Sequence, residues 1–219
     1  MKKQLCSLFV SDTIGSVSGE YTIPKKSSCV VTMAHGAGAG MNHPFMTELA
    51  NALAEKNITT LRFNFPFTEN KKGRPDVPAV AHKTIEAAIA HARKKWPSPP
   101  LFISGKSFGG RMSSQYLATN PDAPVKGIIF YGFPLHPPGK PSADRAAHLK
   151  EVKQPMLFLS GTRDEFATRG LLQDVCSSLK NATLIEIEGA NHGLKAGKQN
   201  TAEMLAEFTK EWVEKLMKI

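Results

Sequence analysis

Short apolar runs alternate with longer amphipathic segments along most of this sequence, and this alternation restricts the possible folds strongly. The runs typical of buried strands are residues 29–34, 58–65, 101–104, 125–133, 156–160 and 183–187. The segments with apolar residues at helical spacing are 44–57, 79–95, 108–119, 167–180 and 201–217. Strands that are separated by helices pair in parallel, and the sheet that they form needs helices on both faces. The sequence therefore predicts an α/β fold with a mostly parallel, twisted sheet.

The remaining segments complete this organisation. Residues 1–12 alternate apolar and polar side chains, which predicts a strand, and residues 19–24 are expected to complete a hairpin with it. The apolar part of this first segment is too short for a signal peptide, and no apolar stretch approaches the roughly 20 residues that cross a bilayer. Residues 66–78 are rich in Pro, Gly, Lys and Asp and are predicted to be a loop. A chain of 219 residues fits one domain, so a single domain over residues 1–219 is expected.

Cysteine content and charge limit the function classes. Cys6, Cys29 and Cys176 lie far apart without metal-ligand spacing, and their odd number predicts free thiols in a reducing, cytoplasmic compartment. The formal net charge of +9 is compatible with nucleic acid, an anionic membrane or an anionic substrate as partner. The basic residues are dispersed in short clusters without a nucleic-acid-binding motif. We therefore expect no nucleic-acid or membrane partner, and we interpret most of the charge as solvated surface.

The sequence GKSFG at residues 105–109 is the first of four signals for catalysis. The pattern G-x-S-x-G is typical of a nucleophile elbow when it follows a strand and precedes a helix, as it does here. Such a turn is strained and crowded by neighbouring backbone, which explains the glycines at 105 and 109. It would place the Ser107 hydroxyl at a helix N-terminus, where negative charge is favoured. The alternative is a turn in which Ser107 only caps the helix.

Candidate partners for Ser107 follow the last two predicted strands. Asp164 comes after residues 156–160, and His192 comes after residues 183–187. An aspartate at the end of a strand can accept a hydrogen bond from an imidazole and hold it in the required tautomer. Asp164 could instead be a helix N-cap, and the adjacent Glu165 is a second candidate acid. The order of nucleophile, acid and histidine, each at the end of a strand, predicts a catalytic triad.

The glycine-rich segment HGAGAG at residues 35–40 follows another predicted strand. A tetrahedral oxyanion needs preorganised backbone N–H donors, and glycines let the backbone approach closely. We predict the amides of Phe108 and Ala37 as the two donors, with Gly38 as the alternative to Ala37. A phosphate-binding loop is the competing interpretation, but the pattern G-x-x-x-x-G-K-[ST] is absent. We expect no cofactor.

Six segments together resemble a known family. They are AHGAGAGM, LRFNFPF, GKSFGGRMSS, GFPLHPPGKP, GTRDEF and ANHGL. The chain resembles the α/β-hydrolase superfamily, in particular its dienelactone-hydrolase-like branch. More narrowly, it is similar to small bacterial hydrolases related to a testis-expressed animal protein and to a subunit of a chromatin acetylation complex. The resemblance, which covers nearly the whole chain, implies the α/β-hydrolase fold and the triad but no particular substrate. Because dienelactone hydrolases carry a cysteine nucleophile, Ser107 argues against a dienelactone substrate.

Residues 134–154 occupy the place where many members of this superfamily insert a lid. The interval is short and rich in proline, so no lid domain is expected. Two interpretations remain for it. Either the site is shallow and open, or the segment packs as a rigid loop beside the pocket.

Several cations lie within a few residues of the predicted triad. Lys106 and Arg111 are the candidate substrate contacts, and Arg163 and Lys195 belong to the same basic group. This group would favour an anionic substrate, whereas a buried Arg111 would tie loops together instead. The histidines on nearby loops lack zinc-ligand spacing, so no metal is expected.

These features predict a serine hydrolase. The expected reaction is cleavage of an ester or thioester of a small or anionic soluble substrate through an acyl-enzyme. The alternative is a hydrolase fold kept as an interaction module that binds a partner without catalysis, because a fold does not determine a function.

Overall fold

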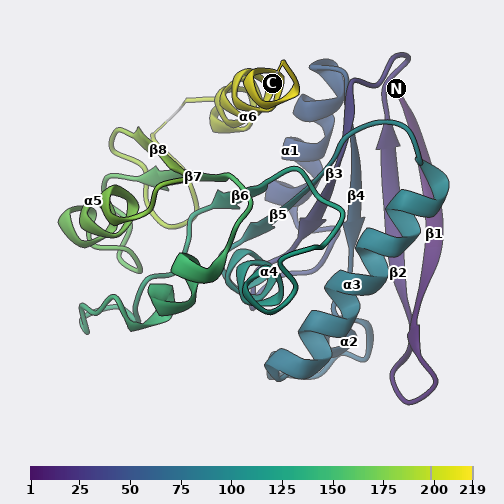
Figure 1. Cartoon of the computed structure of the whole chain (residues 1–219), viewed down its shortest axis with the longest axis horizontal. Helices are drawn as coiled ribbons and strands as arrows, with labels where there is room; N and C mark the ends of the chain where they lie inside the picture. The colour runs from purple at the N-terminus through teal and green to yellow at the C-terminus, as the bar shows by residue number, and fades with distance from the viewer. Residues whose placement is uncertain (198, 219) are drawn as a thin grey trace.

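The computed structural model describes residues 1–197 and 199–218, which form an eight-stranded sheet with helices on both faces (Figure 1). The strands are β1 (Lys2–Ser11), β2 (Gly15–Ile23), β3 (Cys29–Ala34), β4 (Ile58–Phe63), β5 (Leu101–Lys106), β6 (Ile128–Tyr131), β7 (Met156–Gly161) and β8 (Ala182–Ile187). Their spatial order is β1-β2-β4-β3-β5-β6-β7-β8. β2 is antiparallel to both of its neighbours, and all other pairs are parallel. The predicted mostly parallel α/β sheet is confirmed.

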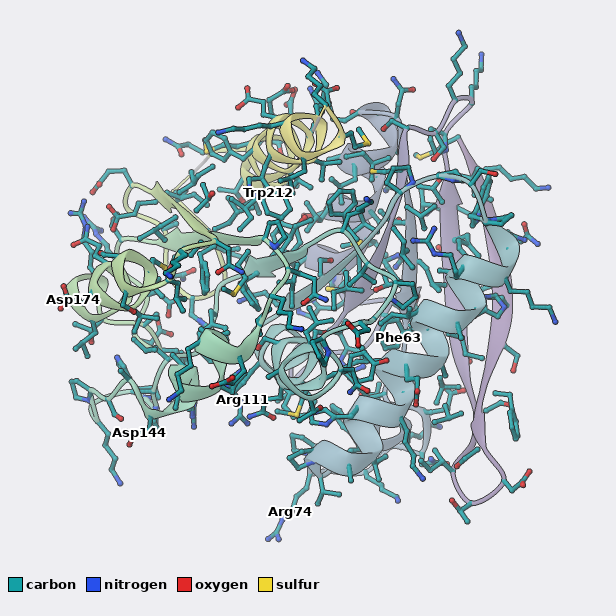
Figure 2. The ribbon with its side chains drawn as sticks, viewed as in Figure 1. Phe63, Arg74, Arg111, Asp144, Asp174 and Trp212 are labelled. Atoms are coloured by element: carbon teal, nitrogen blue, oxygen red, sulfur yellow. The ribbon has the colours of Figure 1, made fainter. Side chains whose placement is uncertain are left out.

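The helices form a layer on each face of the sheet. They are α1 (Pro44–Glu55), α2 (Pro66–Glu69), α3 (Pro78–Lys95), α4 (Phe108–Thr119), the 3-10 helix η1 (Asp144–Glu151), α5 (Arg169–Ser178) and α6 (Thr201–Met217). One buried cluster joins α1 and α6 to the sheet, and a second joins α3, α4, η1 and α5 to its other face. In Figure 2, Trp212 of α6 points toward the sheet, where its ring lies 6.1 Å from that of Phe102. Two apolar layers of this kind supply most of the burial that stabilises an α/β domain.

Two short elements differ from those expected. α2 lies within the predicted loop 66–78, where Pro66 begins the helix and the Phe67 amide donates a hydrogen bond to Asp76 Oδ2 at 2.9 Å. A helix of one turn buries too few apolar side chains to give a helical periodicity. β6 is shorter than the expected 125–133, because the chain turns at Gly132, which has a φ of +71°.

Residues 134–154 pack against the helical layer and form no lid. η1 contacts α4, where His148 Nε2 lies 2.8 Å from Ser114 Oγ. At the start of the segment, the Thr168 amide donates to Nε2 of the buried His136 at 3.0 Å. The start of the segment and η1 are therefore packed, whereas residues 137–141 between them are exposed, and the choice between an open site and a rigid loop beside the pocket stays a prediction.

The three cysteines are free thiols. Cys29 and Cys176 are buried, and burial raises the pKa of each thiol to about 12. Such thiols are inert packing residues, because the nucleophilic species is the thiolate. Within the described residues, no helix combines the length and apolar composition that crossing a membrane requires.

Candidate active site

The loops that carry the candidate residues all follow the carboxyl ends of parallel strands. Ala34 at the end of β3 pairs with Gly105 near the end of β5. Farther along the sheet, Gly161 at the end of β7 pairs with Ile187 at the end of β8. Because these strands are parallel and end in register, the loops that follow them emerge at the same edge of the sheet.

Ser107 lies in a tight turn between β5 and α4. Its φ of 50° and ψ of −113° form a conformation that side-chain-bearing residues rarely adopt. A Cβ at Gly105 would lie 2.2 Å from the Gly110 nitrogen, and one at Gly109 would lie 2.4 Å from the Ala34 oxygen. The Ser107 side chain makes no capping hydrogen bond to the helix. The alternative that Ser107 only caps α4 is therefore wrong.

Alanine at position 109 is expected to destabilise the fold. Its methyl group would collide with backbone atoms, and such overpacking typically costs about 1–3 kcal/mol. Gly38 is the matched control, because a Cβ there meets nothing within 4 Å and its φ is not positive. In thermal unfolding, Gly109→Ala should therefore lower the Tm and Gly38→Ala should leave it nearly unchanged. Equal melting temperatures for the two variants would contradict the close packing of the turn.

His192 lies between Ser107 and Asp164. Its Nε2 is 2.8 Å from Ser107 Oγ, and its Nδ1 is 2.9 Å from both carboxylate oxygens of Asp164. The carboxylate accepts the Nδ1–H, so Nε2 is the unprotonated nitrogen and accepts a hydrogen bond from the Ser107 hydroxyl. The side chain of Asp164 has no exposed surface, whereas 14% of the His192 side chain is exposed.

The structure separates the roles of the two candidate acids. Asp164 Oδ1 also accepts the Phe166 amide at 2.8 Å, which fixes the carboxylate in the turn after β7. The N-cap of the following helix is Thr168, so Asp164 does not cap α5. Glu165 is exposed, and within the described part of the chain its carboxylate accepts only the main-chain amide of His192, at 3.4 Å. Asp164 is therefore the acid that the imidazole contacts.

The segment 35–40 packs beside the Ser107 turn. A Cβ at Gly36 would lie 3.7 Å from the Ser107 Cβ. Within the described residues, the amides of Ala37 and Phe108 donate no hydrogen bond. Both amides remain free for an anionic oxygen. The structure does not distinguish Ala37 from Gly38, because both residues line the same cavity.

His35 shapes this segment from inside the protein. It is fully buried, its Nδ1 lies 2.8 Å from the Gly36 carbonyl, and its Nε2 accepts the Phe65 amide at 3.0 Å. Because Nε2 accepts, the proton is on Nδ1, and the imidazole is neutral. Burial lowers the pKa of His35 to about 4, which keeps it neutral above that pH.

A second group of polar residues ties the far end of the segment to β4. Arg62 is almost fully buried, pairs with Glu20 and donates to the Met41 carbonyl. Asn64 Oδ1 accepts the Met41 amide at 2.9 Å. Thr68 Oγ1 donates to the Ala39 carbonyl at 3.1 Å. These contacts tie Ala39 and Met41, at and just after the end of the glycine-rich segment, to the residues from Arg62 to Thr68.

The predicted site missed His35, Arg62 and Asn64 as positioning residues. Arg62 and Asn64 occur two positions apart around a strand that is otherwise apolar or hydroxyl-bearing. A period of two places both side chains on one face of the strand. This polar pattern is the signal that could have identified them.

Lys106 is held inside the site and not at an exposed rim. Its Nζ donates a hydrogen bond to the main-chain carbonyl of His192 and lies 5.9 Å from the centre of the Phe45 ring. Burial lowers the pKa of Lys106 to about 8, although the carboxylates of Asp164 and Glu165 raise it. Lys106 therefore links the turn of the candidate nucleophile to the loop of the candidate base.

Gly132 makes room for this link. A Cβ at this position would lie 2.9 Å from Lys106 Nζ and 3.3 Å from the His192 carbonyl oxygen. Its positive φ is also one that glycine adopts without strain. The end of β6 thus leaves space for the contact between Lys106, at the end of β5, and the loop of His192.

The other predicted cations lie in different surroundings. Arg111 is half-buried on α4, on the side that faces η1 (Figure 2), and its pKa is lowered by burial and, to a smaller extent, by Arg145 of η1. It does not line the cavity beside Ser107, so its predicted substrate contact has no support here. Lys195 is exposed and lines that cavity, whereas Arg163 is exposed outside it.

The cavity beside Ser107 has a volume of about 710 Å³. Its lining combines the glycine-rich segment, the start of α1, the His192 loop and the start of α6. Phe45, Met46 and Phe166 contribute apolar surface, and Glu48 contributes a carboxylate. The Phe166 ring also packs on the His192 imidazole, with ring centres 4.3 Å apart. Among the described residues, no group of three or more His, Cys, Asp or Glu side chains is placed to hold a metal ion.

Comparison with known proteins identifies the family. Residues 27–218 match the family described as "Alpha/beta hydrolase domain". The chain belongs to the α/β-hydrolase family. Membership supports a hydrolytic activity for this α/β hydrolase, and the sheet order and the packed segment 134–154 agree with a member that has no lid.

Solved structures show the same fold over nearly the whole α/β hydrolase. A dienelactone hydrolase from Anabaena variabilis matches with a TM-score of 0.80 and 19% identity, over 98% of this chain and 97% of the other. An alpha-beta serine hydrolase homologue from Coxiella burnetii matches with a TM-score of 0.77 and 22% identity, over 97% of each chain. A serine hydrolase without a lid from Xanthomonas campestris matches with a TM-score of 0.74 and 21% identity, over 97% of this chain and 95% of the other. The narrower resemblance to the testis-expressed protein stays a prediction.

Proposed function

We propose that this α/β hydrolase is a serine esterase in which Ser107, His192 and Asp164 act as the catalytic triad. One observation carries the proposal: the 2.8 Å contact between Ser107 Oγ and His192 Nε2 continues through Nδ1 to a buried carboxylate. A histidine held in this way is a general base for the hydroxyl, because its free nitrogen faces the proton that must be removed.

The proposed first step forms an acyl-enzyme. His192 Nε2 removes the proton of Ser107 as Oγ bonds to the carbonyl carbon of an ester or thioester. The carbonyl π electrons move to the oxygen, and the amides of Phe108 and Ala37 stabilise the resulting oxyanion. When the oxyanion reforms the carbonyl, the bond to the leaving alcohol or thiol breaks, and the protonated Nε2 donates its proton to it.

Water completes the proposed cycle. It enters through the open side of the site, which no lid covers. His192 Nε2 removes one of its protons while its oxygen attacks the acyl carbon. Ser107 then leaves with the proton that His192 returns, which releases a carboxylic acid and restores the free hydroxyl.

A fluorophosphonate probe tests this proposal on the wild-type chain. Only an activated serine reacts rapidly, so labelling should map to Ser107 and should disappear when the protein is unfolded. A panel of p-nitrophenyl esters of increasing acyl length then measures the size of the acyl group that the cavity accepts. A folded protein that neither reacts with the probe nor hydrolyses any of these esters would instead support a non-catalytic interaction module.

The surroundings of the cavity support a preference for anionic esters. Lys106 and the exposed Lys195 both line the cavity. Among the described lining residues, Glu48 contributes the single carboxylate. We expect kcat/KM for a carboxylate-bearing ester to exceed that for its neutral analogue at low salt by roughly a few-fold. The difference should shrink as salt rises, because the Debye length is about 10 Å at 0.1 M.

A pair of variants tests the source of this preference. Lys195→Gln should reduce it, whereas Arg163→Gln removes an exposed cation outside the cavity and should change it little. Turnover at saturation should stay constant, because electrostatic attraction acts before the chemical step. Equal kcat/KM values for both esters at every salt concentration would show that these cations do not determine which ester is preferred.

A further inference from the structure

His136 is a buried histidine that the proposed mechanism does not use. Only 2% of its surface is exposed. Its Nδ1 lies 2.9 Å from the Pro137 carbonyl oxygen, and its Nε2 accepts the Thr168 amide at 3.0 Å. Since Nε2 accepts, the proton is on Nδ1, which donates to the carbonyl. Burial of a polar ring is costly unless its nitrogens are hydrogen-bonded, so these two contacts are the reason that a histidine is tolerated here.

The partners of His136 belong to the turn after β7 that carries Asp164. The His136 amide donates to the Phe166 carbonyl at 2.9 Å, and the Phe166 amide donates to Asp164 Oδ1 at 2.8 Å. The main chain of Phe166 is therefore held between His136 and the Asp164 carboxylate. The Phe166 ring packs on the His192 imidazole, with ring centres 4.3 Å apart. Phe166 thus contacts both the candidate acid and the candidate base, and His136 fixes its carbonyl group.

The sheet brings these two segments together. His136 follows β6 and Asp164 follows β7, and these strands are parallel neighbours in the sheet (Figure 1). Burial alone does not fix the turn after β7, because Glu165 and Thr168 are exposed and Phe166 is only half-buried. The two hydrogen bonds from His136 therefore supply a constraint that the packing of the turn lacks.

We propose that His136 is a positioning residue that holds the turn from Asp164 to Thr168, and with it the Asp164 carboxylate, against the His192 imidazole. The inference rests on the proposed function of the triad. His136 is not among the described residues that line the cavity, so it acts through Phe166 and Thr168. Without the acceptor at Nε2, the Thr168 amide loses its partner and the turn gains freedom. A displacement of about 1 Å between catalytic groups can lower a rate by roughly 100-fold.

Asparagine and glutamine at position 136 separate the roles of the two ring nitrogens. A glutamine side chain reaches the place of Nε2, so its Oε1 can accept the Thr168 amide, whereas asparagine reaches only the place of Nδ1 and leaves that amide unpaired. With a p-nitrophenyl ester, we expect His136→Asn to lower kcat by roughly tenfold or more. His136→Gln should restore kcat to within a few-fold of the wild-type value.

His91→Ala is the control for a loss of stability alone. His91 Nδ1 lies 3.0 Å from the Tyr21 hydroxyl, between α3 and β2, and neither element carries a residue of the candidate triad. This variant should lower the Tm and leave kcat unchanged. All rates are measured below the unfolding transition of each variant, which circular dichroism determines.

Proton NMR gives a second readout that a loss of stability alone would not change. The Nδ1–H of His192, which the Asp164 carboxylate accepts, should give a downfield resonance that is absent in His192→Gln. His136→Asn should shift or weaken this resonance, whereas His136→Gln and His91→Ala should keep it. The resonance does not depend on turnover. It therefore tests the position of the Asp164 turn even if the wild-type chain hydrolyses no ester, a result that would overturn the proposed function alone.

A measurement on the wild-type chain completes the test without any variant. Nitrogen NMR distinguishes the two imidazole tautomers, and His136 should carry its proton on Nδ1. A proton on Nε2 would overturn the proposal, because that nitrogen could not then accept the Thr168 amide. An Asn variant with the kcat and the His192 resonance of the wild type would also overturn it, as would equal losses of kcat in the Asn and Gln variants.

Discussion

Replacing Ser107 with alanine is expected to lower ester hydrolysis by roughly 10³-fold or more while the protein stays folded. In the proposed mechanism, the hydroxyl is the group of the triad that bonds to the substrate, and His192 Nε2, 2.8 Å away, has no other described proton donor. Alanine removes the nucleophile and leaves the oxyanion donors in place, so a small residual rate should remain. Initial rates with a p-nitrophenyl ester, together with circular dichroism, measure both parts of the prediction.

Two controls make this result specific to the hydroxyl. Ser113→Ala changes a buried serine on α4, the helix that follows Ser107, and should keep nearly all activity. Ser107→Gly should be as inactive as Ser107→Ala but more stable by about 1 kcal/mol, because glycine adopts a φ of 50° without strain. Wild-type turnover by Ser107→Ala would exclude Ser107 as the nucleophile.

Replacing Asp164 with asparagine is expected to lower turnover by roughly 10⁴-fold. Asp164 Oδ1 accepts the Phe166 amide, so the amide oxygen of asparagine would take that place and its NH₂ group would face His192 Nδ1. Nδ1 would then have to accept, which moves the imidazole proton to Nε2. In this tautomer, His192 cannot remove the proton of Ser107.

Glu165→Gln is the matched control for this variant. Glu165 is adjacent in sequence and has the same charge, but it is exposed and bonds only to the His192 main chain. Its substitution should change kcat by no more than a few-fold. Measurements of kcat for both variants over a range of pH distinguish the two acids, and a severe loss in Glu165→Gln with a mild loss in Asp164→Asn would reverse the assignment.

Local sequence was sufficient for the fold and for the order of the candidate triad. Strand and helix periodicities depend on neighbouring residues, so the bounds of β3, α4 and α6 match the expected segments. The glycines at 105 and 109 indicated the tight turn for the same reason, because only a crowded backbone requires them. α2 and the shorter β6 were not predicted, since a one-turn helix has no periodicity and the end of β6 depends on a lysine from another strand.

The sequence alone determined the α/β sheet and the set of candidate residues, because local propensity and apolar spacing encode both. Only the tertiary structure showed that Asp164, and not Glu165, contacts the His192 imidazole. It showed as well that Lys106 donates to the His192 carbonyl and is not part of an exposed basic rim, and that Arg111 does not line the cavity. It also showed that His35 and Arg62 position the glycine-rich segment. These outcomes depend on contacts between residues far apart in the chain, and the direction of each side chain follows from strand register and helix packing that no single segment specifies.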